Sequence, residues 1–475
     1  MLIIISDLHF VDGTAGEHNL PTAAFESVFL SDVIAMARHK GATEVKLLLL
    51  GDIVDLVRSQ QWFAEDPADR PWGENGLRDV PTPQSDSRVE QRCLDILGRF
   101  PSDGRRESVP QDTILYKNWH TFAFFRSLPR TIRRALGRDI PVELIYVAGN
   151  HDRLCNLYPS VRDELCKIMG LTVNERTANV VSAYEWWYRY DYLDERYGLY
   201  ARHGHQFDPW NFGGGNDQTR VGYLKVPVGD VVSTEFAVNL PYTLASLRSK
   251  YPVINNGFIR NLKEVDNVRP FNRIIEWFYY KMKQEHSDEL RRALDETFDT
   301  VLHQFLDVGL VQQWRSPQTQ WDEVLRAASH PWFRRVVNKL TDWTNTEDLL
   351  QLLLPSVERA AYSQEALATY AAAAYHEKIW RENAGMRFVV YGHTHRPGLQ
   401  PLDGENGREV LYLNSGTWRG HIYRTVPLDK SADFVKLKQM TYLCFYHAGE
   451  DRGDKVPDTI SFDVWTGHKL KHYRN

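Results

Sequence analysis

Histidine, aspartate and asparagine recur in short segments that each follow a run of apolar residues. The clearest pair is His393 and His395, which lie two residues apart directly after the apolar run that ends at Tyr391. In a strand followed by a loop, this spacing can place both imidazoles on one side of the backbone, and neutral imidazole is a common metal ligand. On its own, such a pair is more often a polar surface pair than a ligand pair.

Four more segments change that interpretation because they supply Asp, Asn and His side chains in the same setting. They are Asp7-Leu-His9, Gly51-Asp52-Ile-Val-Asp55, Gly149-Asn-His-Asp152 and His203-Gly-His205. Carboxylates together with imidazoles suit Mn²⁺, Fe or Zn²⁺, whereas oxygen ligands alone would indicate Mg²⁺ or Ca²⁺. The sequence therefore predicts a centre for two divalent metal ions, with Mn²⁺ preferred.

The elements expected around the first of these segments form a strand, a helix and a second strand. Leu2 to Ile5 and Val45 to Leu50 are short apolar runs typical of strands that are buried on both faces. Between them, residues 25–38 have apolar side chains at helical intervals. This order predicts a βαβ unit whose parallel strands end at one edge of a sheet, where Asp7, His9 and Asp52 would lie.

Further elements are expected along the rest of the chain. The pattern predicts strands at 142–148, 198–202, 387–391, 410–413, 434–445 and 459–464, and helices at 89–100, 119–136, 161–169, 271–282, 290–305, 321–340 and 347–381. The last three strands are expected to be antiparallel and to close a second sheet. Gly149 is expected to permit an unusual backbone turn, so that the polar residues after it point at one place.

These elements divide the chain into a core and a long insertion. We expect residues 1–207 and 385–475 to form the two parts of one core, with a flexible segment at about 58–112. Residues 208–384 are expected to form a large all-helical insertion. Such an insertion would be a cap over the site or an oligomerisation module, and the fold class expected for the whole chain is α/β.

Composition and charge narrow the class of protein. The 475 residues are 43% apolar with a net charge of −5, which argues against a surface that binds nucleic acid throughout and leaves a local basic groove open. No apolar run is long enough to cross a bilayer, and the first residues lack the basic region and cleavage site of a signal peptide. Four cysteines without CxxC spacing are expected to be reduced thiols. We therefore expect a cytoplasmic protein without a transmembrane segment.

The five polar segments, in this order and each at a predicted strand end, resemble the signature of the calcineurin-like metallophosphoesterases. The resemblance covers residues 1 to about 208 and 385 to about 420. It implies a four-layer α/β/β/α sandwich with two facing sheets. It also implies that one metal ion is held by Asp7, His9, Asp52 and His395, and the other by Asp52, Asn150, His203 and His393.

The same resemblance implies roles for the neighbouring residues. His151 corresponds to a non-ligand histidine beside the scissile phosphate, and Asp152 is expected to orient its imidazole. As a hydroxide that bridges the metals attacks phosphorus, a protonated His151 can stabilise or protonate the leaving group. Arg153 and Arg396 flank the site and can pair with substrate phosphate or with a nearby carboxylate. Asp55 is expected to contact a ligand histidine or to cap the local structure.

Hydrolysis of a phosphodiester or pyrophosphate bond is the reaction that this resemblance favours. The motifs around His203 and His393 are similar to those of the UDP-2,3-diacylglucosamine pyrophosphatases, but this chain has His151 where those enzymes typically carry Arg, and it is far longer. A histidine at that position also occurs in cyclic-nucleotide phosphodiesterases and repair nucleases of the superfamily. The expected partner is a phosphate ester, such as a nucleotide or nucleic acid.

Two other classes of protein stay open. The helical insertion could make the chain a metal-dependent nuclease that acts on DNA or RNA ends, although the net negative charge argues against it. The chain could also be a non-catalytic scaffold built on a decayed site. The presence of every implied ligand, and of His151, argues against that alternative.

Overall fold

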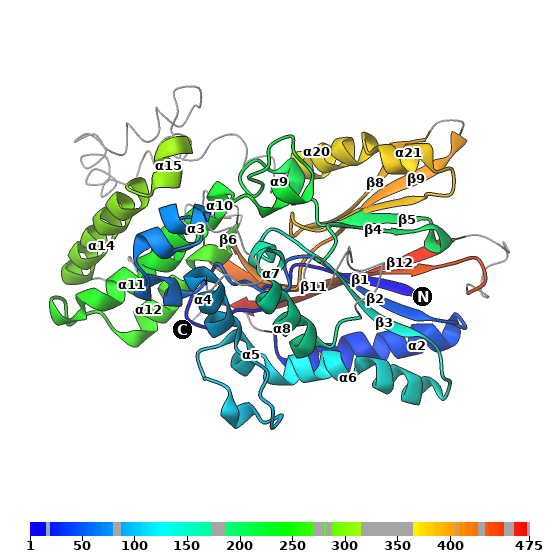
Figure 1. Ribbon diagram of the computed structural model, residues 1–475, viewed down its shortest axis with the longest axis horizontal. Helices are drawn as coiled ribbons and strands as arrows, with labels where there is room; N and C mark the ends of the chain where they lie inside the picture. Colours follow the sequence, from blue (N-terminus) through cyan, green and yellow to red (C-terminus); the bar gives the residue numbers. More distant parts are fainter. Residues whose placement is uncertain are drawn as a thin grey trace.

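Two mixed β-sheets and many helices make up the fold (Figure 1). The structure is a computed structural model of the chain. It describes all residues except 16–19, 79–86, 173–186, 270–276, 278–279, 282–286, 315–363, 405–406, 426–432, 451–459 and 473–475. Within the described residues, no helix combines the length and the apolar character needed to span a membrane.

The larger sheet has seven strands and contains both the first and the last strand of the described chain. β1 (Leu2–Ile5), β2 (Val45–Leu50) and β3 (Val142–Val147) are parallel neighbours. β11 (Phe434–Tyr446) pairs antiparallel with β1, with β10 (Gly420–Arg424) and with β12 (Ser461–His472), and β6 (Val268–Arg269) pairs parallel with β10. The parallel pairing of β1 with β2 confirms the predicted βαβ unit.

The smaller sheet has five strands in the order β4-β5-β7-β9-β8. β5 (Leu199–Arg202), β7 (Phe388–Tyr391) and β9 (Glu409–Ser415) are parallel, and β4 (Asp191–Asp194) and β8 (Pro397–Asp403) are antiparallel edge strands. The prediction that the strands after β9 close this sheet is wrong, since β11 and β12 extend the larger sheet. An alternating pattern indicates a strand but does not say which sheet the strand joins.

Three apolar clusters show how the layers are stacked. Leu2 and Ile4 of β1 belong to a cluster that also contains Phe388 and Val390 of β7, so this cluster lies between the two sheets. Ile3 and Ile5 of β1 face a second cluster, made with the helices on the far side of the larger sheet. A third cluster joins the smaller sheet to α20 (Gln364–Tyr375) and α21 (Lys378–Glu382). β1 is apolar at every position because its two faces belong to different cores.

The helices in the first part of the chain agree closely with those predicted from the spacing of apolar residues. The helices predicted at 25–38, 89–100, 119–136 and 161–169 are present. The helical elements here are α1 (Thr22–Ala24), the π-helix η1 (Phe25–Leu30), α2 (Ser31–His39), η2 (Gln60–Ala64), η3 (Pro67–Asp69), α3 (Glu74–Arg78), α4 (Arg88–Leu97), η4 (Arg106–Ser108), α5 (Ile114–Lys117), α6 (Trp119–Leu136), α7 (Arg153–Leu157), α8 (Pro159–Met169), η5 (Glu195–Tyr197) and η6 (His205–Phe207).

Residues 208–384, called the inserted segment below, are mostly helical where they are described. Besides α20 and α21, the helical elements are α9 (Arg220–Leu224), α10 (Val228–Val231), the π-helix η7 (Val232–Val238), α11 (Asn239–Ser246), η8 (Leu247–Ser249), α12 (Asn256–Leu262), η9 (Lys263–Asn267), α14 (Asp288–Leu306) and α15 (Gly309–Trp314). The prediction of an all-helical segment misses β6, which joins the larger sheet. The predicted helix at 321–340, most of 271–282 and the first part of 347–381 lie outside the described residues.

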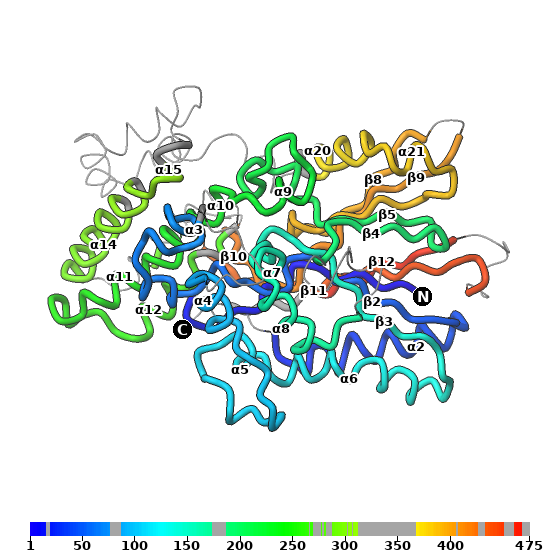
Figure 2. Tube along the Cα trace, viewed as in Figure 1, coloured from blue at the N-terminus to red at the C-terminus, as the bar shows by residue number. Residues whose placement is uncertain are grey.

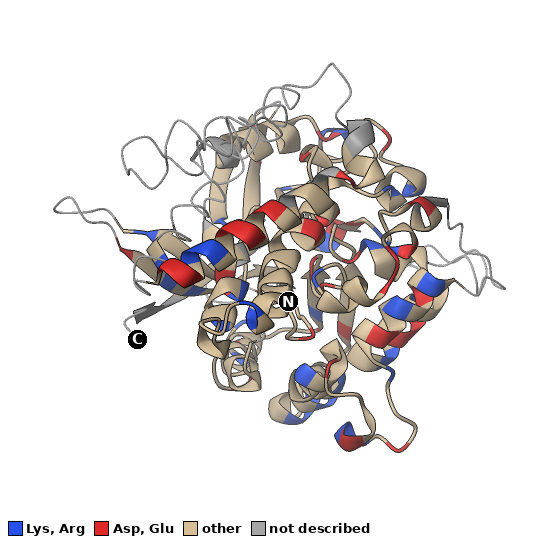
Figure 3. Cartoon of the chain, turned by 90° about the vertical axis from the view of Figure 1, so that its left-hand side faces the viewer, with Lys and Arg blue, Asp and Glu red and all other residues tan. Residues whose placement is uncertain are grey.

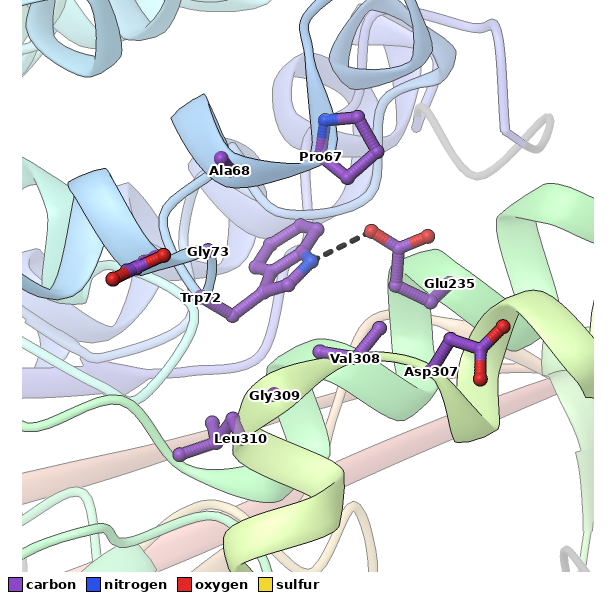
Figure 4. A pocket seen from close by; sticks show the side chains of 10 residues that line it. Pro67, Ala68, Trp72, Gly73, Glu235, Asp307, Val308, Gly309 and Leu310 are labelled. Atoms are coloured by element: carbon purple, nitrogen blue, oxygen red, sulfur yellow. Dashed lines mark hydrogen bonds between the residues drawn. The ribbon is translucent and has the colours of Figure 1, made fainter.

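The described part of the inserted segment lies side by side with residues 58–78 and α4, far away in the sequence (Figure 2). Arg70 Nη1 donates to both carboxylate oxygens of Glu235, at 2.6 and 2.8 Å, and Trp72 Nε1 donates to the same carboxylate at 2.6 Å. A cavity of about 490 Å³ lies beside this contact, between residues 67–74 and 307–310 (Figure 4). Buried polar contacts therefore tie the inserted segment to the core.

Candidate metal centre

The predicted site residues follow the carboxyl ends of parallel strands in both sheets. In the larger sheet, Asp7 and His9 follow β1, Asp52 follows β2, and Asn150 to Asp152 follow β3. In the smaller sheet, His203 follows β5, and His393 and His395 follow β7. Because the sheets face each other, these two rows of strand ends meet in one place.

Among the described residues, three groups of His and Asp side chains could each hold a metal ion; one of them is His9, Asp55 and the partly buried His151, and the other two are fully buried. Asp7, His9, Asp52 and His395 each place one ligand atom within 4.8 Å of the others. Asp52, His203 and His393 do the same, so Asp52 belongs to both groups. All these residues are at most 9% exposed. The structure thus brings together the histidines and carboxylates that the resemblance assigned to two metal ions.

In the first group, the atoms that face inward could hold a cation between them. His9 Nε2 lies 3.0 Å from His395 Nε2, which lies 3.1 Å from Asp7 Oδ1. The other ring nitrogens are held from outside, His9 Nδ1 by Asp55 Oδ2 at 3.2 Å and His395 Nδ1 by His421 Nε2 at 3.1 Å. A neutral imidazole that donates from Nδ1 presents a lone pair at Nε2. Lone pairs and carboxylates that face one another fit a divalent cation.

The second group has the same arrangement. His203 Nδ1 donates to the carbonyl of Leu50 at 2.8 Å, and its Nε2 lies 3.1 Å from Asp52 Oδ2. Among the residues that the structure describes, His203 Nε2, Asp7 Oδ1 and Asn150 Oδ1 are buried and lack a hydrogen-bond partner. Buried polar atoms are nearly always satisfied, so the orphaned atoms here fit ligands of a cation.

Backbone conformation singles out the same residues. In the described part of the chain, the non-glycine residues with positive φ are Asp7, His9, Asp52, His393 and His395. A left-handed conformation at such residues costs about 1–3 kcal/mol each and persists only where the surrounding structure imposes it. The restriction of this strain to five predicted ligands indicates that the loops are shaped to turn these side chains inward.

Glycines allow the loops to approach each other closely. A Cβ on Gly149 would lie 2.2 Å from Asp52 Oδ1, and one on Gly51 would lie 2.5 Å from His203 Nδ1. Gly149 is not among the glycines with positive φ. The predicted reason for this glycine, an unusual turn, is therefore wrong, and close contact with Asp52 is the reason that the structure gives.

His151 lies beside the first group, next to Asp55. Its Nδ1 is 3.0 Å from Asp55 Oδ1, and its ring meets the ring of His9 edge-on at a centroid distance of 4.8 Å. Burial lowers the pKa of His151, but the carboxylates of Asp55 and Asp52 outweigh burial and raise that pKa to about 9. The neighbouring carboxylates therefore favour the protonated imidazole. Asp55 contacts both His9 and His151, in line with its expected contact with a ligand histidine.

Asp152 does not orient His151, so that prediction is wrong. Its carboxylate accepts backbone N–H groups from Asp52 at 2.5 Å, from Val54 at 3.1 Å and from Gly149 at 3.0 Å. Asp152 thus fixes the loop that carries Asp52. A carboxylate directly after a histidine in sequence can point away from it, because the backbone turns between the two residues.

The two arginines predicted to bind substrate differ in placement. Arg153 is buried, its Nη2 lies 3.0 Å from Asp230 Oδ2, and its Nη1 donates to the carbonyl of Leu224. The structure therefore shows the carboxylate alternative for Arg153, and its prediction as a substrate ligand is wrong. Arg396 is exposed directly after His395, and its role stays a prediction.

Residues that the sequence did not single out contact the predicted ligands. His421 faces His395, and Asn211 accepts a hydrogen bond from Asn150 Nδ2 at 3.4 Å. A lone histidine in an alternating strand and an asparagine near a run of glycines carry no signal in their spacing. Only the fold brings them to the site.

No family model matches the chain, and no curated protein matches it either. The resemblance to the metallophosphoesterases therefore depends on the sequence motifs, to which the structure adds buried His/Asp groups that could hold metal ions.

Proposed function

We propose that the protein is a calcineurin-like metallophosphoesterase, which hydrolyses phosphate esters with two divalent metal ions. One observation carries this proposal: two buried His/Asp groups share Asp52 and are built from strained loops at the ends of parallel strands. The order of layers, with helices outside two facing sheets, supports an α/β/β/α sandwich. In this proposal residues 1–207 and 385–475 form the enzyme core, and residues 208–384 are inserted into it.

The residues that would hold the metal ions follow from the orphaned and lone-pair atoms. Asp7, His9, Asp52 and His395 would hold one ion, and Asp52, Asn150, His203 and His393 the other. The mixture of imidazole and oxygen ligands suits Mn²⁺, Fe or Zn²⁺. When bound, the two ions would supply an acidified water and stabilise negative charge on the phosphoryl oxygens.

The chain's own residues supply the proton in this proposal. His151 sits beside the first group and next to the carboxylate of Asp55, which favours its protonated form, and an imidazolium here could donate to the oxygen that leaves phosphorus. Asp55 would keep that ring in place from its other side. Arg396, exposed beside His395, would pair with the phosphate of the substrate.

A phosphodiester or pyrophosphate bond in a nucleotide is the substrate that we favour over a nucleic-acid end. A nuclease needs a basic groove to follow the phosphate backbone. α14 instead carries interspersed charges, with Asp288 and Glu289 before Arg291. Figure 3 shows both signs of charge mixed over this side of the described chain, and the net charge is −5.

The test is hydrolysis of bis-p-nitrophenyl phosphate and of p-nitrophenyl phosphate with added Mn²⁺. We expect metal-dependent turnover with preference for the diester, and none with Asp52→Asn. Preference for the monoester would make the protein a phosphatase. A chain that binds two metal ions but turns over neither ester would be the non-catalytic scaffold.

A further inference from the structure

The start of the inserted segment contacts two predicted ligands of the second metal ion from outside. His393 Nε2 lies 3.0 Å from Asp208 Oδ2. Asn150 Nδ2 donates to Asn211 Oδ1 at 3.4 Å, and Asn211 Nδ2 donates to Asp208 Oδ2 at 2.8 Å. These four side chains form one continuous hydrogen-bonded chain from Asn150 to His393.

This chain decides which atoms of Asn150 and His393 face the site. Because the amide nitrogen of Asn150 donates to Asn211, its Oδ1 points the other way and, within the described structure, is buried without a hydrogen-bond partner. Because His393 uses Nε2 toward Asp208, its Nδ1 is left for the side of Asp52. An amide oxygen and an unprotonated ring nitrogen bind metal ions, whereas N–H groups do not.

Asp208 and Asn211 are themselves fixed by the fold of the inserted segment. Asp208 Oδ1 accepts the backbone N–H of Trp210 at 2.9 Å, and Gly229 N donates to the carbonyl of Trp210 at 2.8 Å. A Cβ on Gly229 would lie 2.5 Å from Asn211 Oδ1, so α10 packs directly against this side chain. α10 also supplies Asp230 to the buried ion pair with Arg153.

The direct outer partners of the first group lie outside the inserted segment. His9 is backed by Asp55, which follows β2, and His395 is backed by His421 in β10. β10 itself pairs with β6 of the inserted segment. The two metal positions therefore differ in which part of the molecule holds their ligands.

We propose that Asp208 and Asn211 are positioning residues for the second metal ion, so that the start of the inserted segment helps to set the affinity of that ion. This inference rests on the proposed function, since it concerns the same two metal ions. Loss of an outer hydrogen-bond partner of a metal ligand typically lowers metal affinity about 10- to 100-fold.

The experiment measures Mn²⁺ binding to the full chain by titration calorimetry, with the bound metal counted per chain. Asp208→Asn keeps an oxygen for the N–H of Trp210 but places an amide against His393. Asn211→Ala removes the partner of Asn150. We expect each variant to weaken one of two sites about 10- to 100-fold and to leave the other unchanged. Asp217→Asn is the matched control, because its carboxylate caps Thr219 in the same segment and should bind Mn²⁺ like wild type.

The outcomes separate the inference from the proposed function. If both Mn²⁺ affinities of both variants equalled those of wild type, the inference would be wrong while the two-metal proposal would stand. Equal weakening of both sites would have the same consequence. A wild-type chain that binds no Mn²⁺ would overturn the proposed function instead. Circular dichroism and thermal unfolding in the presence of a chelator check that each variant folds. If Asp208→Asn does not fold, the metal affinities of Asn211→Ala alone decide the test.

Discussion

The two candidate metal positions share Asp52 but differ in their outer supports. Asp55 and His421, which hold His9 and His395, come from the strands and loops of the core. Asp208 and Asn211, which hold His393 and Asn150, come from the inserted segment. The direct outer partners of the first position thus lie outside the inserted segment, whereas those of the second belong to it.

Replacement of the shared carboxylate, Asp52, should abolish metal binding at both positions. Asp52→Asn takes a charged ligand from both groups, so we expect loss of both metal ions and a fall in Mn²⁺-dependent hydrolysis on the order of 1,000-fold or more. Elemental analysis and diester turnover measure the two effects. A variant that kept one tightly bound ion would show that Asp52 serves one position only.

Removal of His151 should spare both metal positions and affect the chemical step. In His151→Ala we expect two bound metal ions and a rate lowered about 100- to 10,000-fold, the usual contribution of a positioned acid. The loss should be smaller for a substrate whose leaving group is a weak base, because that group needs no proton. If His151→Ala emptied the site on elemental analysis, His151 would be a ligand and the roles assigned above would be wrong.

The sequence predicted the centre better than its surroundings, for a physical reason. Strand ends such as those before Asp7 and His203 are marked by local apolar runs, and parallel neighbours must bring their ends to one edge. By contrast, the sheet that β11 joins, the direction of Asp152 and the approach of His421 depend on contacts between segments far apart in the chain. Spacing along the sequence carries no information about such contacts.

The buried contact between Glu235 of the inserted segment and residues 67–74 should contribute to the stability of the whole fold. Glu235→Ala would leave the buried Arg70, 8% exposed, without its carboxylate. It would also remove the acceptor of Trp72 Nε1, a bond that Figure 4 shows. Breaking a buried ion pair costs about 3–5 kcal/mol. We expect a loss of that size in the free energy of unfolding, measured in urea.

A matched control for this loss is Arg88→Ala, which removes an ion pair with Asp69 from a side chain that is 77% exposed. Exposed pairs contribute about 0–1 kcal/mol, so this variant should unfold almost like wild type. Equal losses in the two variants would mean that the contact at Glu235 does not tie the inserted segment to the core.

Replacement of His421 should weaken binding of the first metal ion, whereas replacement of Asp208 should weaken binding of the second. His421 Nε2 lies 3.1 Å from His395 Nδ1, and the two rings stack at a centroid distance of 5.1 Å. Without this partner, His395 can turn or change tautomer, so we expect His421→Ala to weaken the first metal ion about 10- to 100-fold and to leave the second unchanged. Calorimetric titration with Mn²⁺ resolves the two sites.

The double variant His421→Ala/Asn211→Ala tests directly whether the two metal positions have separate outer supports. If the core supports one position and the inserted segment the other, the two losses should fall on different sites and add, because independent outer contacts have no shared partner. Tyr423→Phe, which removes the hydroxyl 3.3 Å from His421 Nδ1, is the control and should change binding less than His421→Ala. If His421→Ala and Asn211→Ala weakened the same metal site, the two positions would depend on common outer contacts, and the separate hydrogen-bond chains would not explain their affinities.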